Sequence, residues 1–164
     1  MFVLQAPLLF FNPHEAAVVD AMTARIIPRE SGSPGAREAR AIIYIDRALA
    51  GYFSSLQVFY REGIEMIDAQ TKSRFAKSFA NATEAEQDEV LRAIERSQIF
   101  SVVYEHTIEG TFGDPIHGGN YDAVGWKLIG FPGAQHGYTE SQMAPGFDAR
   151  SIPIVTLSDL AKPT

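Results

Sequence analysis

The sequence predicts a mainly α-helical protein, with a compact bundle of about five helices followed by a long ordered loop and an extended C-terminal arm. Two observations support this fold class. Apolar residues recur at spacings of three and four through most of the first 110 residues, as on one face of a helix. Eight of the 13 glycines then fall within residues 113–147, where no helical period continues. This second region is also rich in proline and aromatic residues, and predicts the loop.

Length and composition limit the class of protein. A chain of 164 residues that is 46% hydrophobic and 21% charged is typical of one globular domain with a real core. A net charge of −6 without any basic cluster argues against nucleic-acid binding. No stretch approaches the roughly 20 consecutive apolar residues of a membrane span. The absence of cysteine excludes disulfides, thiolate metal sites and covalent haem attachment through Cys-x-x-Cys-His.

We therefore expect a single domain over residues 1–164. Its predicted parts are an apolar N-terminal arm at 1–12, a helical core at 13–110, an interaction loop at 111–147 and an extended tail at 148–164. The N-terminal arm is apolar but lacks the basic region and small-residue cleavage site of a signal peptide. We expect it to be an arm that packs on something, without deciding between this chain and a partner.

The first helix begins at a capping signal. Asn12 can cap it, Pro13 suits its first position, and Glu15 follows three residues after the cap. A buried face is predicted by Val18, Val19, Met22 and Ile26, and Pro28 ends the helix.

The second helix is predicted over about residues 36–53 and the third after Ser55. Their apolar stripes are Ile42, Ile45, Leu49 and Tyr52 in the second, and Leu56, Phe59, Tyr60, Ile64 and Ile67 in the third.

A fourth helix begins at Thr83, which forms a capping box with Glu86 and precedes the inward-facing Leu91 and Ile94. The fifth covers about residues 98–109, and Gly110 is its expected terminator. Its predicted stripe is Ile99, Val102, Val103 and His106.

Two clusters of polar residues are candidates for chemistry. His106 lies beside Glu105 and three residues before Glu109, but two-metal bundles need a second such motif, and none occurs. We interpret His106 as a core residue that finds a hydrogen bond. Asp114 and His117 are an acid and a base three residues apart, which could serve acid–base catalysis, although Asp114 before a proline is equally well explained as a turn former.

The predicted loop is too apolar to remain solvated, so we expect it to be ordered against a surface. Trp126 beside Lys127, near Tyr121 and Phe131, has the composition of a protein-interface anchor. The alternative is that these aromatic residues fold back onto the helices as ordinary core. Residues 152–157 predict an extended arm or a lone edge strand.

One long motif is recognisable. The string GTFGDPIHGGNYDAVGWKLIGFPG at residues 110–133 closely resembles the signature of the gluconate 2-dehydrogenase subunit 3 family. Shorter matches precede it at FNPHEA (11–16), IIP (26–28), PGA (34–36) and YID (44–46). The resemblance covers about residues 10 to 133.

The resemblance implies a non-catalytic small subunit of a periplasmic or membrane-associated sugar or polyol dehydrogenase. Members of this family bind no cofactor, so no catalytic, cofactor or metal residue is expected here. The partner is a flavoprotein large subunit of the glucose–methanol–choline type, which holds FAD. A cytochrome c subunit or domain with haem c often takes the electrons.

The family's small subunits support maturation, stability and export of the flavoprotein, so we expect a periplasmic location. No twin-arginine leader is visible in this sequence, which leaves the subunit role unaffected. The expected partner interface consists of Gly113, Asp114, Pro115, His117, Gly118, Gly119, Asn120, Tyr121, Asp122, Gly125, Trp126, Lys127, Phe131, Pro132 and Gly133. The alternatives are a free-standing enzyme that uses Asp114 and His117, or a ligand-binding helical module.

Overall fold

The computed structural model describes residues 7–162, and within them the chain is mainly α-helical and contains no β-strand. The predicted fold class is confirmed. The α-helices are α1 (Pro13–Ile26), α2 (Ala41–Ala50), α3 (Gln57–Phe75), α4 (Glu84–Ile94), α5 (Gln98–Phe112), α6 (Val124–Ile129) and α7 (Leu157–Leu160). Short 3-10 turns lie at η1 (Ser54–Leu56), η2 (Phe79–Asn81), η3 (Pro115–His117), η4 (Tyr121–Ala123) and η5 (Ala149–Ser151).

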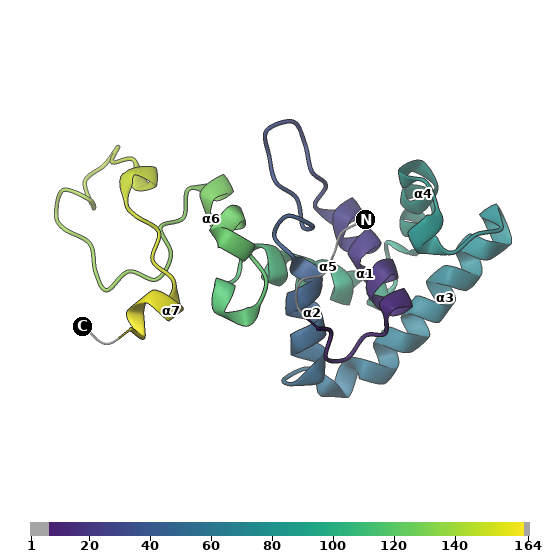
Figure 1. Ribbon diagram of the computed structural model, residues 1–164. Helices are drawn as coiled ribbons and strands as arrows, with labels where there is room; N and C mark the ends of the chain where they lie inside the picture. Colours follow the sequence, from purple (N-terminus) through teal and green to yellow (C-terminus); the bar gives the residue numbers. More distant parts are fainter. Residues whose placement is uncertain (1–6, 163–164) are drawn as a thin grey trace.

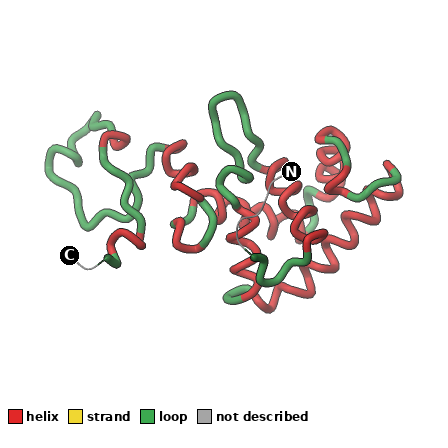
Figure 2. The backbone as a smooth tube through the Cα atoms, viewed as in Figure 1, coloured by secondary structure: helices red, strands yellow, loops and turns green. Residues whose placement is uncertain are grey.

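The five helices α1 to α5 form a bundle, with α6 at its edge (Figure 1). The residues after α6 lead away from the bundle, so that the C-terminal end lies opposite α3 and α4. Most of that C-terminal part is loop, as Figure 2 shows. No helix within residues 7–162 is long and apolar enough to cross a membrane.

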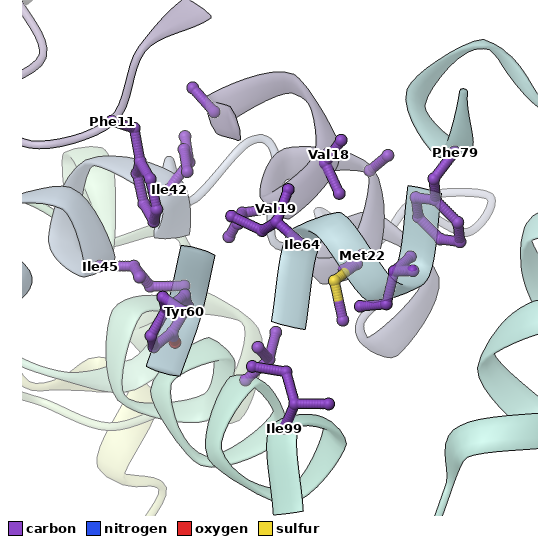
Figure 3. Close-up of a cluster of buried hydrophobic side chains, with 14 of the residues drawn as sticks. Phe11, Val18, Val19, Met22, Ile42, Ile45, Tyr60, Ile64, Phe79 and Ile99 are labelled. Carbon is purple, nitrogen blue, oxygen red and sulfur yellow. The ribbon is translucent and has the colours of Figure 1, made fainter. Parts of the chain in front are cut away.

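Side chains from all five bundle helices and from the segment before α1 build one core. Figure 3 shows Val18 and Met22 of α1 near Ile64 of α3 and Ile99 of α5, with Phe79 at one side of the cluster. Each of these side chains is at most 5% exposed. The apolar stripes of α1, α3, α4 and α5 therefore supply the buried faces that their spacing predicts.

Both predicted capping boxes are present. The Asn12 side chain accepts hydrogen bonds from the backbone N–H groups of His14 and Glu15, and the Glu15 carboxylate accepts one from the Asn12 N–H. Thr83 and Glu86 exchange the same pair of bonds at the start of α4. These bonds satisfy N–H groups that a helix start otherwise leaves unpaired.

The prediction for the second helix is wrong at both ends. Arg40 adopts φ +54°, which breaks a helical run, so α2 begins only at Ala41. It ends at Ala50, and Tyr52 lies beyond the C-cap Gly51 with 90% of its surface exposed. Tyr52 is therefore a surface residue and not part of the buried stripe.

The expected helix end at Gly110 is also wrong, since α5 continues to Phe112 and Gly113 is its C-cap. Gly110 serves packing instead. A Cβ at this position would lie 3.0 Å from the Cα and carbonyl oxygen of Ala41. Glycine at 110 thus lets α5 lie closely against the start of α2.

His106 occupies the core, as its place on the apolar stripe predicts. It is 5% exposed, its Nδ1 lies 2.8 Å from the Tyr60 hydroxyl, and its ring stacks on Phe53. Burial lowers the pKa of His106, while Glu109 and Glu105 oppose this shift. The neutral imidazole can accept a hydrogen bond from the Tyr60 hydroxyl, and this bond joins α5 to α3.

The segment before α1 is held by one buried carboxylate. Asp46 on α2 is 1% exposed and accepts the backbone N–H groups of Leu9, Phe10 and Phe11 at 2.6, 3.0 and 2.9 Å. Phe11 is thereby placed in the core, where its ring lies 5.9 Å from that of Tyr60. Residues 9–11 of the predicted arm are thus bound to this chain's own bundle, whereas residues 1–6 lie outside the described part.

Replacing Asp46 by alanine should destabilise the protein strongly, because three N–H groups lose their acceptor at once. We expect a loss of about 3 kcal/mol in the free energy of unfolding, measured by urea denaturation. Asp20→Ala is the matched control: it removes only a surface ion pair with Arg37 and should cost less than about 1 kcal/mol. Equal losses in the two variants would contradict this role of Asp46.

The lowered pKa of His106 makes stability depend on pH. In the unfolded chain His106 takes up a proton near pH 6.5, whereas in the folded chain it does so only at a lower pH. The free energy of unfolding therefore has the full contribution of His106 above pH 6.5. This contribution is lost as the pH falls further. Urea denaturation from pH 8 to 5 should show a smaller decline in His106→Gln than in the wild type. Parallel curves would show that His106 titrates equally in both states.

Candidate functional site

The predicted interaction loop is not a loop throughout. The 113–133 segment, which makes up most of the motif at residues 110–133, contains η3, η4 and α6. Helix α6 has only six residues, which is too short for a helical period to stand out in the sequence. The segment folds back along the C-terminal end of α5, which lies beside α6 in Figure 1.

Asn120 connects the segment to α5. It is 1% exposed, its backbone N–H donates to the Gly110 carbonyl at 2.7 Å, and its side-chain amide donates to the Gly113 carbonyl at 2.8 Å. Its side-chain oxygen accepts the N–H of Gly125 at 2.8 Å. One side chain thus satisfies groups at the end of α5 and at the start of α6. Its φ of +43° is tolerated more readily by asparagine than by most residues.

Two glycines allow this close approach. A Cβ on Gly119 would lie 2.1 Å from the carbonyl oxygen of Gly110, and one on Gly125 would lie 2.0 Å from that of Thr111. Both contacts are with backbone, which cannot move aside as a flexible side chain can. Gly119 and Gly125 are therefore required by this chain's own fold.

Trp126 packs within this chain, which is the alternative to an interface anchor that the sequence left open. It is 4% exposed, its Nε1 donates to the Phe112 carbonyl at 2.6 Å, and the ring of Phe131 meets it edge-on. Its ring is already covered by the chain's own atoms, so Trp126 supports the segment from within.

The C-terminal arm is attached to the same segment. Val155 and Gly133 form a single parallel β-bridge, which is the only pairing in the predicted edge strand within the described residues. The Val155 N–H donates to the Pro132 carbonyl at 3.0 Å, and the Ala134 N–H donates to the Val155 carbonyl at 2.7 Å. Gly133 adopts φ +81°, and a Cβ there would lie 2.1 Å from the Val155 oxygen.

Asp114 and His117 do not form an acid–base pair in the described chain. The Asp114 carboxylate accepts the N–H of Ile116 at 2.9 Å and the N–H of Leu157 at 3.0 Å. Asp114 thereby caps η3 and fixes the start of α7. The His117 side chain is exposed on the surface nearby. No group of three or more His, Asp or Glu side chains in residues 7–162 is arranged to hold a metal.

The outer side of the segment carries exposed apolar and charged groups. Of the predicted interface residues, His117, Tyr121, Asp122, Lys127 and Phe131 are exposed. The guanidinium of Arg40 lies 3.4 Å from the centre of the Tyr121 ring, and Lys127 pairs with Asp122 at 2.8 Å. Sequence reasoning missed three exposed apolar neighbours, Ile116, Leu128 and Ile129.

A groove of about 600 Å³ lies where η3 faces the C-terminal half of α2. We call it the aromatic groove; it is lined by Tyr44, Arg47, Ala48, Tyr52 and Phe53, and by Ile116 and His117 across from them. The Tyr44 hydroxyl donates to the Glu109 carboxylate at 2.7 Å. Burial, together with Glu109, raises the pKa of Tyr44. The sequence does not predict the α2 side of the aromatic groove, because the spacing of Tyr52 places it on the buried stripe.

The model of one protein family matches this chain. It is described as Gluconate 2-dehydrogenase subunit 3 and covers residues 13–133. The match ends where the 113–133 segment ends, and includes Asn120, Gly119 and Gly125. No curated protein and no solved structure matches the chain.

Substituting Gly125 by alanine should disrupt the 113–133 segment. The added Cβ meets a backbone oxygen, so we expect a loss of about 3 kcal/mol or more in unfolding free energy. The single tryptophan, Trp126, reports the change directly through a red shift of its fluorescence.

Gly137→Ala is the matched control, because no atom beyond the two neighbouring residues lies within 4 Å of its added Cβ. It should change stability by less than about 0.5 kcal/mol. Wild-type stability and unshifted fluorescence in Gly125→Ala would show that the close approach to Thr111 is not required.

Proposed function

The chain belongs to the gluconate 2-dehydrogenase subunit 3 family, and from this membership we propose that it is the non-catalytic small subunit of an FAD-dependent sugar dehydrogenase complex. In this proposal it binds and stabilises the flavoprotein large subunit and assists its maturation or export. FAD resides in that partner, and a cytochrome c subunit or domain receives the electrons. The complex acts in the periplasm or faces it.

One observation supports this proposal most strongly. Ile116, Tyr121, Leu128, Ile129 and Phe131, all in the 113–133 segment and within the family match, are exposed. Apolar groups gathered on one segment are typical of a surface that a partner protein covers. The segment is also fixed from within by Asn120, so binding need not order it first.

The free-standing enzyme is less well supported. Catalysis by Asp114 and His117 would require the carboxylate to face a substrate, but both of its oxygens accept backbone N–H groups. That arrangement explains Asp114 as a structural cap.

The isolated chain is expected to be colourless and inactive in dye-linked sugar oxidation. A tagged chain purified from the cells that naturally make it should bring down a polypeptide with flavin absorbance near 450 nm, and the complex should oxidise a sugar. Removing the partner should remove both signals. Turnover by the chain after all flavoprotein is removed would overturn the non-catalytic role.

A substitution that places a charged side chain on the exposed face of α6 should weaken the complex without unfolding the chain. We expect Ile129→Asp to reduce affinity for the large subunit by about 10- to 100-fold, or about 1.4–2.8 kcal/mol, because the side chain would be desolvated on binding. Tyr104→Asp, an exposed aromatic position on α5 outside the segment, is the control and should bind normally. Equal affinities in both variants would place the interface elsewhere.

A further inference from the structure

The aromatic groove joins two parts of the chain that are far apart in sequence. Tyr52 and Phe53 follow α2, and Ile116 belongs to η3 in the 113–133 segment. Tyr52 and Ile116 are both exposed, so the groove opens to the surface and leaves large apolar walls in contact with water. The groove adjoins the apolar groups of the proposed interface through Ile116.

Arg47 gives this groove its charge. Its guanidinium lies across Gly118, where a Cβ would be 2.7 Å from Nη1 and 2.9 Å from Cδ. Glycine at 118 therefore leaves the space that Arg47 occupies. Within residues 7–162 Arg47 is one of several basic side chains that form no ion pair, so its guanidinium remains available to a carboxylate, unlike those of Arg25 and Arg37.

None of the residues that line the groove is acidic. Glu109 accepts the Tyr44 hydroxyl, and Asp114 accepts two backbone N–H groups. The groove thus presents an arginine between aromatic and aliphatic walls, on a chain whose net charge is −6. The charge of Arg47 is thus opposite in sign to the net charge of the chain. An arginine fork binds a carboxylate through two parallel hydrogen bonds, which a partner's acidic side chain can supply.

We propose that the aromatic groove binds an acidic segment of the large subunit, in which an Asp or Glu carboxylate pairs with Arg47 and a neighbouring apolar side chain covers Tyr52 and Ile116. This inference rests on the proposed function, since it names how that partner is recognised. Both halves of the groove contribute: α2 supplies the charge and η3 supplies the facing wall. The groove therefore forms only when the 113–133 segment is folded.

Cross-linking tests which segment enters the groove. The chain has no cysteine, so Tyr52→Cys creates a unique site for a maleimide–diazirine reagent. In the complex purified from native cells, this variant should cross-link to a flavoprotein peptide that contains Asp or Glu. Arg96→Cys, at an exposed position in the turn between α4 and α5, should not label that peptide. Cross-links to a second copy of this chain, to its own residues 1–6, or to a peptide without acid would overturn the proposal.

Charge reversal tests the pairing itself. Arg47→Glu should weaken binding of the large subunit by about 30-fold, and Arg96→Glu by less than about twofold. Replacing the cross-linked acid by arginine should restore binding to Arg47→Glu. If Arg47→Glu binds the flavoprotein with wild-type affinity, the groove does not bind the large subunit, although the proposed subunit role remains intact. If no flavoprotein co-purifies with the wild type, the proposed function fails, and this inference fails with it.

Discussion

The contact between Asn120 and the end of α5 is the constraint on which the second half of the molecule depends. The last carbonyl groups of a helix lack intrahelical partners. Asn120 donates its N–H groups to one of them, at Gly110 of α5, and to the carbonyl of the C-cap Gly113. The same side chain receives the N–H of Gly125 and so begins α6. Trp126 is then directed onto the Phe112 carbonyl, and Gly133 is placed where Val155 can pair with it.

The family motif therefore divides by burial into two roles. Gly119, Asn120, Gly125 and Trp126 are buried and hold the segment to this chain. Ile116, Tyr121 and Ile129, among others, are exposed on its outer side. In our account the first set builds the surface and the second set meets the partner. A glycine-rich motif need not contact a partner through its glycines, because here they admit the chain's own backbone.

The bundle could be predicted from sequence because its signals are local. The capping residues Asn12 and Thr83 and the spacing of apolar residues depend only on near neighbours. The predictions are wrong or incomplete where contacts between residues far apart in the sequence determine the structure. Gly110 remains within α5 because Ala41 lies against it, and Asp46 gathers three N–H groups from a segment 35 to 37 residues away. The burial of Trp126 likewise depends on where α5 ends, which its spacing alone does not reveal.

The contacts of the 113–133 segment with α5 fold it before any partner binds. Hydrogen exchange of the free chain tests this directly at the amides of Asn120 and Gly125, whose N–H groups are bonded to Gly110 and to the Asn120 side chain. Our account predicts slow exchange at both amides, comparable to that of the α5 interior. Exchange of both amides at the rate of an unfolded peptide, with protection only after the large subunit is added, would contradict it.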